Sequence, residues 1–493
     1  MACTTILVGK KASYDGSTLV ARNEDSPSGM FNPKKFIVVK PEDQPRKYKS
    51  VISKVEIELP DNPLRYTCMP NAVDDEGVWG ACGVNELNVS MTATETLTTN
   101  ERVLAADPLV YYIPAKDGEK EVFGGIGEED MVTLVLPYIK SARDGVARLG
   151  SLLEKYGTYE MNGIAFQDVD EIWWLETIGG HHWIARRVPD ECYVIMPNQL
   201  GLDHFDLDDA LGEQKEFMCS KDLKEFIEKY HLDLSFDGNL NPRDAFGSHS
   251  DADHTYNTPR AWILQRFFNP TTYYWDGIDA DFTPESDNIP WMMIPERKIT
   301  VEDIKYALSH HFQGTEYDCY ARHTDGILKG KFRPIGINRN NFMGLVQIRP
   351  YMPEAIRSIE WLSLGSNVFN AVVPFYANVL DTPNYLKNTT NTVTTDDFYW
   401  TNRLVAALAD AHYSQTASHI ERYQQACQSK LSEFINKTDA DFLKDNVSNV
   451  NEFLQKANDK IADELKVQTI DLLDKVLYTA SCNMKNGFAR SDA

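Results

Sequence analysis

The third residue of the chain is a cysteine that opens a run of apolar and β-branched residues. Residues 3–9 read Cys-Thr-Thr-Ile-Leu-Val-Gly, a pattern typical of a β-strand. If Met1 and Ala2 are removed, Cys3 carries both a thiol and a free α-amine, whose ordinary pKa values are about 8.5 and about 7.7–8.0. A nucleophile and a base on one residue suit acyl transfer. The alternative is a small buried hydrophobic residue, the usual setting of a free cysteine.

A second strand-like segment brings polar side chains back toward Cys3. Asp15-Gly16 is a turn signal, and residues 17–25 read Ser-Thr-Leu-Val-Ala-Arg-Asn-Glu-Asp, so the sequence predicts an antiparallel hairpin. In that hairpin Arg22 falls opposite Cys3, to within about two positions, and Asp25 lies just beyond the strand end. A guanidinium beside a thiol favours the thiolate, and a carboxylate beside the amine can orient it. An ordinary hairpin with polar residues at its open end is the alternative.

These motifs resemble those of cysteine N-terminal-nucleophile hydrolases. A cysteine at the mature amino terminus followed by Arg-Asn-x-Asp at residues 22–25 is similar to the bile salt hydrolase and penicillin V acylase type. The whole string of residues 2–25, with His-Phe-Gln-Gly-Thr-Glu-Tyr-Asp at residues 311–318, resembles the bacterial dipeptidase A family more closely. The resemblance implies an α+β fold, the four-layer αββα sandwich of these hydrolases. It also implies amide-bond hydrolysis through Cys3.

The resemblance points to two further residues. Residues 193–198 are similar to the strand whose terminal asparagine donates to the oxyanion in the acylase relatives, which indicates Asn198. Its alternative is a strand-end asparagine that forms a turn. Residues 257–262 resemble the segment with the relatives' second arginine, so Arg260 would support the site or meet the substrate carboxylate. Otherwise Arg260 is a first-turn helix residue with its charge in solvent.

One position departs from the acylase pattern. The acylase relatives place another oxyanion asparagine after an Asn-Glu hairpin, but residues 91–95 here read Met-Thr-Ala-Thr-Glu, with threonine where that asparagine would fall. Asn85, Asn88 or a backbone N–H could take its place, and the sequence does not choose between them.

Composition excludes several classes of function. The 493 residues carry a formal net charge of −24, which argues against nucleic-acid binding and against an anionic membrane surface. No run approaches the roughly eighteen apolar residues of a membrane span, and the amino terminus lacks the pattern of a signal peptide. The eight cysteines include no CxxC pair, which predicts free thiols in the cytoplasm.

Strand patterns dominate the first part of the chain and helical patterns the last. A central antiparallel sheet is predicted from residues 163–167, 171–176, 182–186 and 193–196, with further strands at 344–348 and 358–363. A helical stretch is predicted at 129–153, and the pattern is almost entirely helical from 396 to 477. We therefore expect a hydrolase core of residues 1–393. We expect residues 394–493 to form a helical region packed on it, which would serve as packing, an oligomer contact or a lid.

Metal and nucleotide sites have little support in the sequence. His181-His182 and His310-His311 are paired histidines, yet no HExxH motif or Cys/His ligand spacing accompanies them. No GxxxxGK[ST] motif and no strand-linked GxGxxG is present. We expect no cofactor and no metal, and we expect a homo-oligomer.

The residues and the resemblance together predict a cysteine dipeptidase of broad side-chain preference. Cys3 would attack the peptide carbonyl and form a thioester, with its own α-amine as the base. Arg22 would bias the thiol toward ionisation, and Asp25 would orient the amine. Asn198 would hold the oxyanion, and Arg260 would support the site or meet the substrate carboxylate. The alternatives are an acylase that acts on a penicillin or bile-salt type amide, and a non-enzymatic interaction protein similar to the secernins.

The dipeptidase interpretation requires processing. Removal of Met1 exposes Ala2 and leaves Cys3 without a titratable α-amine. We therefore expect a second cut before Cys3, made by the Cys3 thiol on the preceding peptide bond.

Overall fold

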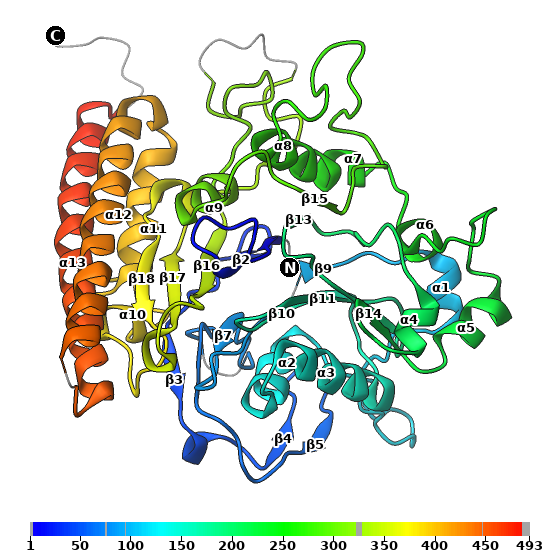
Figure 1. The fold of residues 1–493 in the computed structure, drawn as a ribbon. Helices are drawn as coiled ribbons and strands as arrows, with labels where there is room; N and C mark the ends of the chain where they lie inside the picture. The colour runs from blue at the N-terminus through cyan, green and yellow to red at the C-terminus, as the bar shows by residue number, and fades with distance from the viewer. Residues whose placement is uncertain (1–2, 74–75, 94, 322–327, 446, 486–493) are drawn as a thin grey trace.

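The computed structural model describes residues 3–73, 76–93, 95–321, 328–445 and 447–485. Within these residues the strands form two seven-stranded sheets and two two-stranded ribbons, and paired strands run antiparallel throughout. Helices pack outside the large sheets, and a bundle of long helices stands at one end of the molecule (Figure 1). The chain therefore has a mixed α/β fold with a helical C-terminal part.

The N-terminal hairpin lies at the centre of the first sheet. In spatial order the strands are β15 (Met292–Met293), β13 (Tyr193–Met196), β1 (Cys3–Val8), β2 (Thr18–Asp25), β16 (Asn340–Ile348), β17 (Ser358–Leu364) and β18 (Val373–Tyr376). Successive side chains of a strand point to opposite faces. Leu7 and Val20 join the apolar core between the two sheets, while Ile6 and Ala21 join a core covered by helices. The predicted hairpin is confirmed.

The second sheet contains most of the strands predicted for the central sheet. In spatial order they are β14 (Phe217–Cys219), β12 (Trp183–Arg187), β11 (Ile172–Thr177), β10 (Asn162–Gln167), β8 (Ser90–Thr92) and β7 (Cys82–Val84), and β9 (Glu95–Thr96) also pairs with β10. The prediction that residues 193–196 belong with β10 to β12 is wrong, because β13 pairs with β1 in the first sheet. Alternation within a short strand identifies a buried face but not the partner strand.

The two large sheets lie face to face. Gln167 Nε2 in β10 donates hydrogen bonds to the main-chain oxygens of Thr18, at 2.7 Å, and Val346, at 3.2 Å. Trp174 from the second sheet and Met196 from the first lie in the shared apolar core. The amino-terminal end of β1 lies beside β9 (Figure 1). The first residue of β1 therefore sits at one end of the space between the sheets.

Helices α2 (Glu128–Val135) and α3 (Ala142–Tyr156) cover the second sheet. The single predicted helix of residues 129–153 is divided by a 3₁₀ turn at Leu136–Tyr138. Pro137 explains the division, because proline has no N–H to continue the helical ladder. The short helices of the middle of the chain are α1 (Glu101–Ala106), α4 (Leu207–Leu211), α5 (Leu223–Tyr230), α6 (Pro242–Phe246), α7 (Asp253–Tyr256), α8 (Thr258–Phe268), α9 (Val301–Leu308) and α10 (Asn384–Lys387).

The predicted helical pattern near the C-terminus forms three helices. They are α11 (Phe398–Asp410), α12 (Tyr413–Lys444) and α13 (Val450–Cys482). They pack against β17 and β18 at the edge of the first sheet (Figure 1). The two ribbons are β3 (Ile37–Val39) with β6 (Tyr66–Cys68), and β4 (Lys47–Lys49) with β5 (Glu56–Glu58). None of the helices in the described ranges is long and apolar enough to span a membrane.

A buried ion pair ties the helical bundle to the first sheet. Asp439 in α12 pairs with Arg349, which follows β16, and both side chains are almost fully buried. Tyr376 at the end of β18 donates a hydrogen bond to Asp439 Oδ1 at 2.8 Å. Breaking a buried pair leaves an uncompensated charge, which is strongly destabilising.

We expect Asp439→Ala to lower the free energy of unfolding by about 3–5 kcal/mol, because Arg349 stays buried without its carboxylate. Urea denaturation measures the change. Glu452→Ala is the control, because Glu452 forms an exposed pair with Lys456 at 2.6 Å on α13, and such pairs contribute about 0.3–0.5 kcal/mol. Equal losses in the two variants would contradict a tethering role for Asp439.

Candidate active site

Cys3 is the first residue of β1 and its side chain is completely buried. Arg22 Nη2 donates a hydrogen bond to Cys3 Sγ at 3.1 Å. The register differs by two residues from the prediction: Cys3 pairs with Glu24, and Thr5 pairs with Arg22. The nine-residue connection between the strands lets the register shift, and a two-residue shift keeps every side chain on its predicted face. Arg22 therefore still faces the same side as the thiol and reaches it diagonally.

Arg22 also joins two carboxylates. Its Nη1 lies 3.1 Å from Glu24 Oε2, and its Nη2 lies 2.7 Å from Glu128 Oε1, at the start of α2. Lys34 pairs with the second oxygen of Glu24 at 2.7 Å. All four side chains are buried. Burial would raise the pKa of Glu24, but Lys34 and Arg22 hold it below its ordinary value. The guanidinium is thus held by carboxylates from two different layers of the fold.

Burial and charge act on the pKa of the Cys3 thiol in opposite directions. Burial raises the pKa of the Cys3 thiol well above its ordinary value, and the charge of Arg22 opposes this increase without cancelling it. Desolvation disfavours the charged form of any buried group. Arg22 therefore acts in the predicted direction, toward the thiolate, and burial outweighs its effect. Ionisation of Cys3 in this setting requires a base.

Asn198 and Arg260 both contact the main chain of Cys3. The Cys3 N–H donates to Asn198 Oδ1 at 3.1 Å, and Arg260 Nη1 donates to the Cys3 carbonyl oxygen. Arg260 Nη2 lies 2.8 Å from the same Asn198 oxygen, and Asn198 Nδ2 donates to the Thr96 carbonyl at 2.9 Å. Asn198 follows β13, so the pairing of β13 with β1 is what brings it to the site.

Arg260 is fully buried in the first turn of α8, so its alternative as a solvent-exposed charge is wrong. Burial and the neighbouring Arg333 lower the pKa of Arg260 to about 9. Its hydrogen bonds go to neutral oxygens of Cys3, Thr4, Tyr256, Asn198 and Asn257. Arg260 therefore fixes the backbone that carries the thiol.

Asp25 is buried at the end of β2, where other side chains hold its carboxylate. Its carboxylate pairs with Arg333 and accepts a hydrogen bond from Asn340 Nδ2 at 3.1 Å. Asp25 is one position beyond Glu24 in β2, so its side chain starts on the opposite face of the strand. In the described residues the Cys3 N–H is held by Asn198. The predicted contact between Asp25 and the amine stays a prediction.

The two asparagines considered for the second oxyanion donor have structural partners. Asn85 Nδ2 donates to the carbonyls of Leu136 and Ile139, at 3.0 and 2.8 Å. Asn88 Nδ2 donates to the Glu354 carbonyl at 3.1 Å. Both amides close loops away from Cys3. A backbone N–H therefore remains the candidate for the second oxyanion donor.

A cavity of about 380 Å³ adjoins Cys3 through Asn198. Its lining combines side chains from β9, from the loop after β13 and from α7, namely Thr96, Thr98, Asn198, Ser250, Ala252, Asp253, Tyr256 and Asn257. Three larger cavities, of about 580, 500 and 400 Å³, lie elsewhere in the described residues, the first two around Arg266 near the C-terminal end of α8 and the third between α9 and α12. None of them is lined by a residue with a hydrogen bond to Cys3. The cavity beside Asn198 is therefore the one placed for a substrate of the thiol.

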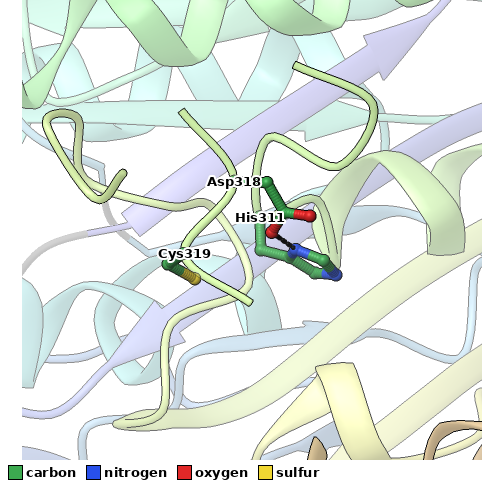
Figure 2. A group of neighbouring side chains, drawn as sticks. All are labelled: His311, Asp318 and Cys319. Atoms are coloured by element: carbon green, nitrogen blue, oxygen red, sulfur yellow. Dashed lines mark hydrogen bonds and ion pairs between the residues drawn. The ribbon is translucent and has the colours of Figure 1, made fainter. Parts of the chain in front are cut away.

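His311, Asp318 and Cys319 form one group with the composition of a metal site, and Figure 2 shows them facing one another. His311 Nδ1 lies 2.7 Å from Asp318 Oδ1, and its Nε2 lies 3.1 Å from the hydroxyl of Tyr413 in α12. Both ring nitrogens are thus engaged in hydrogen bonds. This arrangement fits a link between the loop and the bundle better than a metal centre. His182, in the other histidine pair, bonds Asp107 at 2.7 Å and stacks on Phe226.

Comparison with known proteins identifies the class of the chain. The sequence profile of peptidase family C69 matches residues 2–426, and the chain belongs to this family. The chain is 58% identical to a dipeptidase of Bifidobacterium longum and 53% identical to a probable dipeptidase A of Streptococcus pyogenes serotype M3, in each case over 100% of both chains. It is 45% identical to dipeptidase A of Lactobacillus helveticus over 96% of each chain. The predicted family resemblance is confirmed.

Sequence reasoning missed several charged residues around the thiol. They are Glu24, Lys34, Glu95, Glu128 and Arg333. Glu24 was inside the Arg-Asn-x-Asp motif and, by alternation, on the face of Cys3, so a stricter use of strand periodicity would have found it. The others come from distant segments without a local pattern.

We expect Arg22→Lys to lower kcat/KM on the order of 10²-fold, because one ammonium cannot bridge a thiol and two carboxylates as a guanidinium does. Alkylation of Cys3 by iodoacetamide should also shift to higher pH, since Arg22 is the group that lowers the thiol pKa. Steady-state kinetics and the pH dependence of alkylation give the two readouts.

Arg187→Lys is the matched control. Arg187 in β12 bridges Glu171 and Asp190, at 3.1 and 3.0 Å, away from Cys3. This variant should keep wild-type turnover. An Arg22→Lys enzyme as active as the Arg187→Lys enzyme, with an unshifted alkylation profile, would reduce Arg22 to a purely structural charge.

Proposed function

We propose that the chain is a cysteine dipeptidase that hydrolyses dipeptides of broad side-chain type through a thioester on Cys3. The observation that carries the proposal is the hydrogen bond from Arg22 to a thiol at the start of β1, in a member of peptidase family C69. The names of the relatives, which are dipeptidases at 45–58% identity, support the substrate class. The fold in this proposal is the four-layer αββα sandwich of N-terminal-nucleophile hydrolases, with a core of residues 1–393 and a helical region of 394–493.

The reaction begins with proton transfer within one residue. Once Ala2 is removed, the Cys3 α-amine takes the thiol proton, and Sγ attacks the carbonyl carbon of the scissile peptide bond. The amine then gives the proton to the leaving amino group. The N-terminal amino acid remains as a thioester, and water releases it. The base is needed because burial opposes a free thiolate.

The remaining site residues position this chemistry. We assign Arg22 the role of holding the thiol. Asn198, at the edge of the cavity, would donate a hydrogen bond from its side-chain N–H₂ to the oxyanion. Arg260 supports both Asn198 and the Cys3 carbonyl. Asp25, one strand position beyond Glu24, remains the proposed orienter of the amine. Such fixed donors act on developing charge without reorganisation.

The proposal also includes the cellular compartment and the oligomeric state of the enzyme. None of the eight cysteines, all of which lie in the described residues, forms a disulfide, which supports a reducing cytoplasm. A homo-oligomer is part of the same proposal. Neither a cofactor nor a metal is required by the proposed steps.

We expect Cys3→Ala to abolish dipeptide hydrolysis with the fold intact, because only one small side chain at a strand start is lost. Cys3→Ser should retain little activity, since a hydroxyl ionises far less readily than a thiol. Cys219→Ala, which removes another buried thiol at the end of β14, is the control and should stay active. Turnover of a panel of dipeptides, tripeptides and acylated amines measures the effect.

Near-wild-type turnover by Cys3→Ala would end the proposal. Hydrolysis of acylated amines in preference to dipeptides would favour the acylase alternative. Iodoacetamide should inactivate the enzyme with the label on Cys3 before the other seven cysteines. EDTA should leave activity unchanged, and EDTA sensitivity would revive a metal mechanism.

Maturation follows from the same chemistry. We expect Cys3 Sγ to attack the Ala2 carbonyl carbon while its proton passes to the Cys3 nitrogen. The C–N bond then breaks, and water hydrolyses the resulting thioester. The mature chain should begin at Cys3 by intact mass, and Cys3→Ala should retain Ala2.

Fully active enzyme that still carries Ala2 would exclude the α-amine as base. A histidine would then have to act, and the first candidates for mutation are His182, His254 and His311. In the structure each of these side chains bonds a carboxylate, from Asp107, Asp287 and Asp318 respectively. None of these pairs includes Cys3, which favours the amine.

A further inference from the structure

Glu95 in β9 reaches across the space between the sheets toward the nucleophile. The side chain is completely buried, and its Oε2 accepts a hydrogen bond from Thr5 Oγ1 at 2.8 Å. Thr5 is two residues beyond Cys3 in β1, so the two side chains leave the strand on the same face. Glu95 is also among the charges that raise the pKa of the Cys3 thiol. Its carboxylate therefore lies over the face of β1 from which the reacting thiol projects.

One oxygen of this carboxylate lacks a donor. Oε1 of Glu95 is buried and accepts no hydrogen bond within the described ranges of the chain. Its charged neighbours are Arg260, Arg22 and Arg333. Arg22 bonds Glu24 and Glu128, Arg260 bonds neutral oxygens, and Arg333 pairs with Asp25. Burial raises the pKa of Glu95 to about 8 against the opposing charges of Arg260 and Arg22. A buried acceptor without a donor is costly and uncommon in native structures.

A dipeptide brings a cation to this position. Its α-nitrogen is two bonds from the carbonyl carbon that the thiol attacks, so any residue that holds the ammonium must lie beside the nucleophile. An ammonium offers three donors, and a buried carboxylate is its strongest acceptor. Thr96, the neighbour of Glu95 in β9, lines the cavity that adjoins Asn198. A substrate in this cavity therefore lies next to the strand that carries Glu95.

We propose that Glu95 Oε1 binds the α-ammonium of the dipeptide and makes the enzyme selective for substrates with a free amino terminus. This inference rests on the proposed dipeptidase function and deepens it. The amine of mature Cys3 is the competing cation, but the Cys3 nitrogen already has an acceptor in Asn198 Oδ1 at 3.1 Å. In the proposed mechanism the Cys3 amine is the neutral base, so the substrate ammonium is the cation that Glu95 Oε1 meets.

The test compares two substrates that differ only in the amine. Alanyl-phenylalanine has the α-ammonium, and propionyl-phenylalanine replaces it with hydrogen. Wild-type enzyme should prefer alanyl-phenylalanine on the order of 10²-fold in kcat/KM, because the second substrate leaves a buried carboxylate unpaired. Glu95→Gln keeps the shape and the contact to Thr5 but removes the charge. This variant should lose the preference. KM for alanyl-phenylalanine should increase, while kcat/KM for propionyl-phenylalanine should change little.

Glu360→Gln is the matched control. Glu360 in β17 is also buried, its Oε1 accepts a hydrogen bond from Thr67 at 2.9 Å, and its Oε2 has no partner in the described ranges. Burial likewise raises its pKa to about 8. The control variant should keep the wild-type preference, since Glu360 does not contact the site. A change common to both variants would show a general effect of removing a buried carboxylate and would overturn the proposal.

The remaining outcomes separate this inference from the proposed function. If wild-type enzyme cleaves the two substrates equally well, that result alone overturns the inference about Glu95. An equal decrease in kcat/KM for both substrates in Glu95→Gln would mean that Glu95 acts on the enzyme's own amine or on folding. That result would also overturn the inference. Wild-type enzyme that cleaves no dipeptide at all would instead refute the dipeptidase proposal itself.

Discussion

The buried guanidinium of Arg22 is the interaction on which the site depends. It contacts the Cys3 thiol, Glu24 on its own strand and Glu128 at the start of α2. Charges taken out of water are tolerated only when every partner is in place. Arg22 can therefore hold the thiol only while the first sheet and the helix layer outside the second sheet keep their relative positions. The cross-sheet bonds of Gln167 help to keep them so.

The same burial explains why the proposed nucleophile needs its own base. Desolvation raises the thiol pKa by more than Arg22 lowers it. A thiol in such a place is inert unless an acceptor for its proton lies within reach. The α-amine of Cys3 exists only after Ala2 is removed, so in this account maturation creates the base. Hydrolysis of dipeptides is thereby limited to the processed chain. In the unprocessed chain the thiol reacts with its own preceding peptide bond, whose nitrogen takes the proton.

The sequence predicted what is local and missed what is assembled from distant segments. The hairpin, the facing of Arg22 toward Cys3 and the helical C-terminal part follow from turn signals and periodicity, and the structure confirms them. Asn198 and Arg260 were found through resemblance alone, because β13 joins β1 by a pairing that alternation cannot reveal. The extent to which burial opposes ionisation of the thiol could not be predicted, because burial cannot be judged from residue types. The division of residues 129–153 at Pro137 was readable in the sequence and was overlooked.

The central claim is that an aminoacyl group resides on Cys3 during turnover, and acid quenching followed by peptide mapping tests it most directly. Mature enzyme mixed with excess dipeptide and quenched in acid should carry an added mass equal to the N-terminal aminoacyl group. The added mass should lie on the peptide that begins at Cys3, and hydroxylamine should remove it, as expected of a thioester. The same aminoacyl mass on any other residue, or its persistence in Cys3→Ala, would contradict the account.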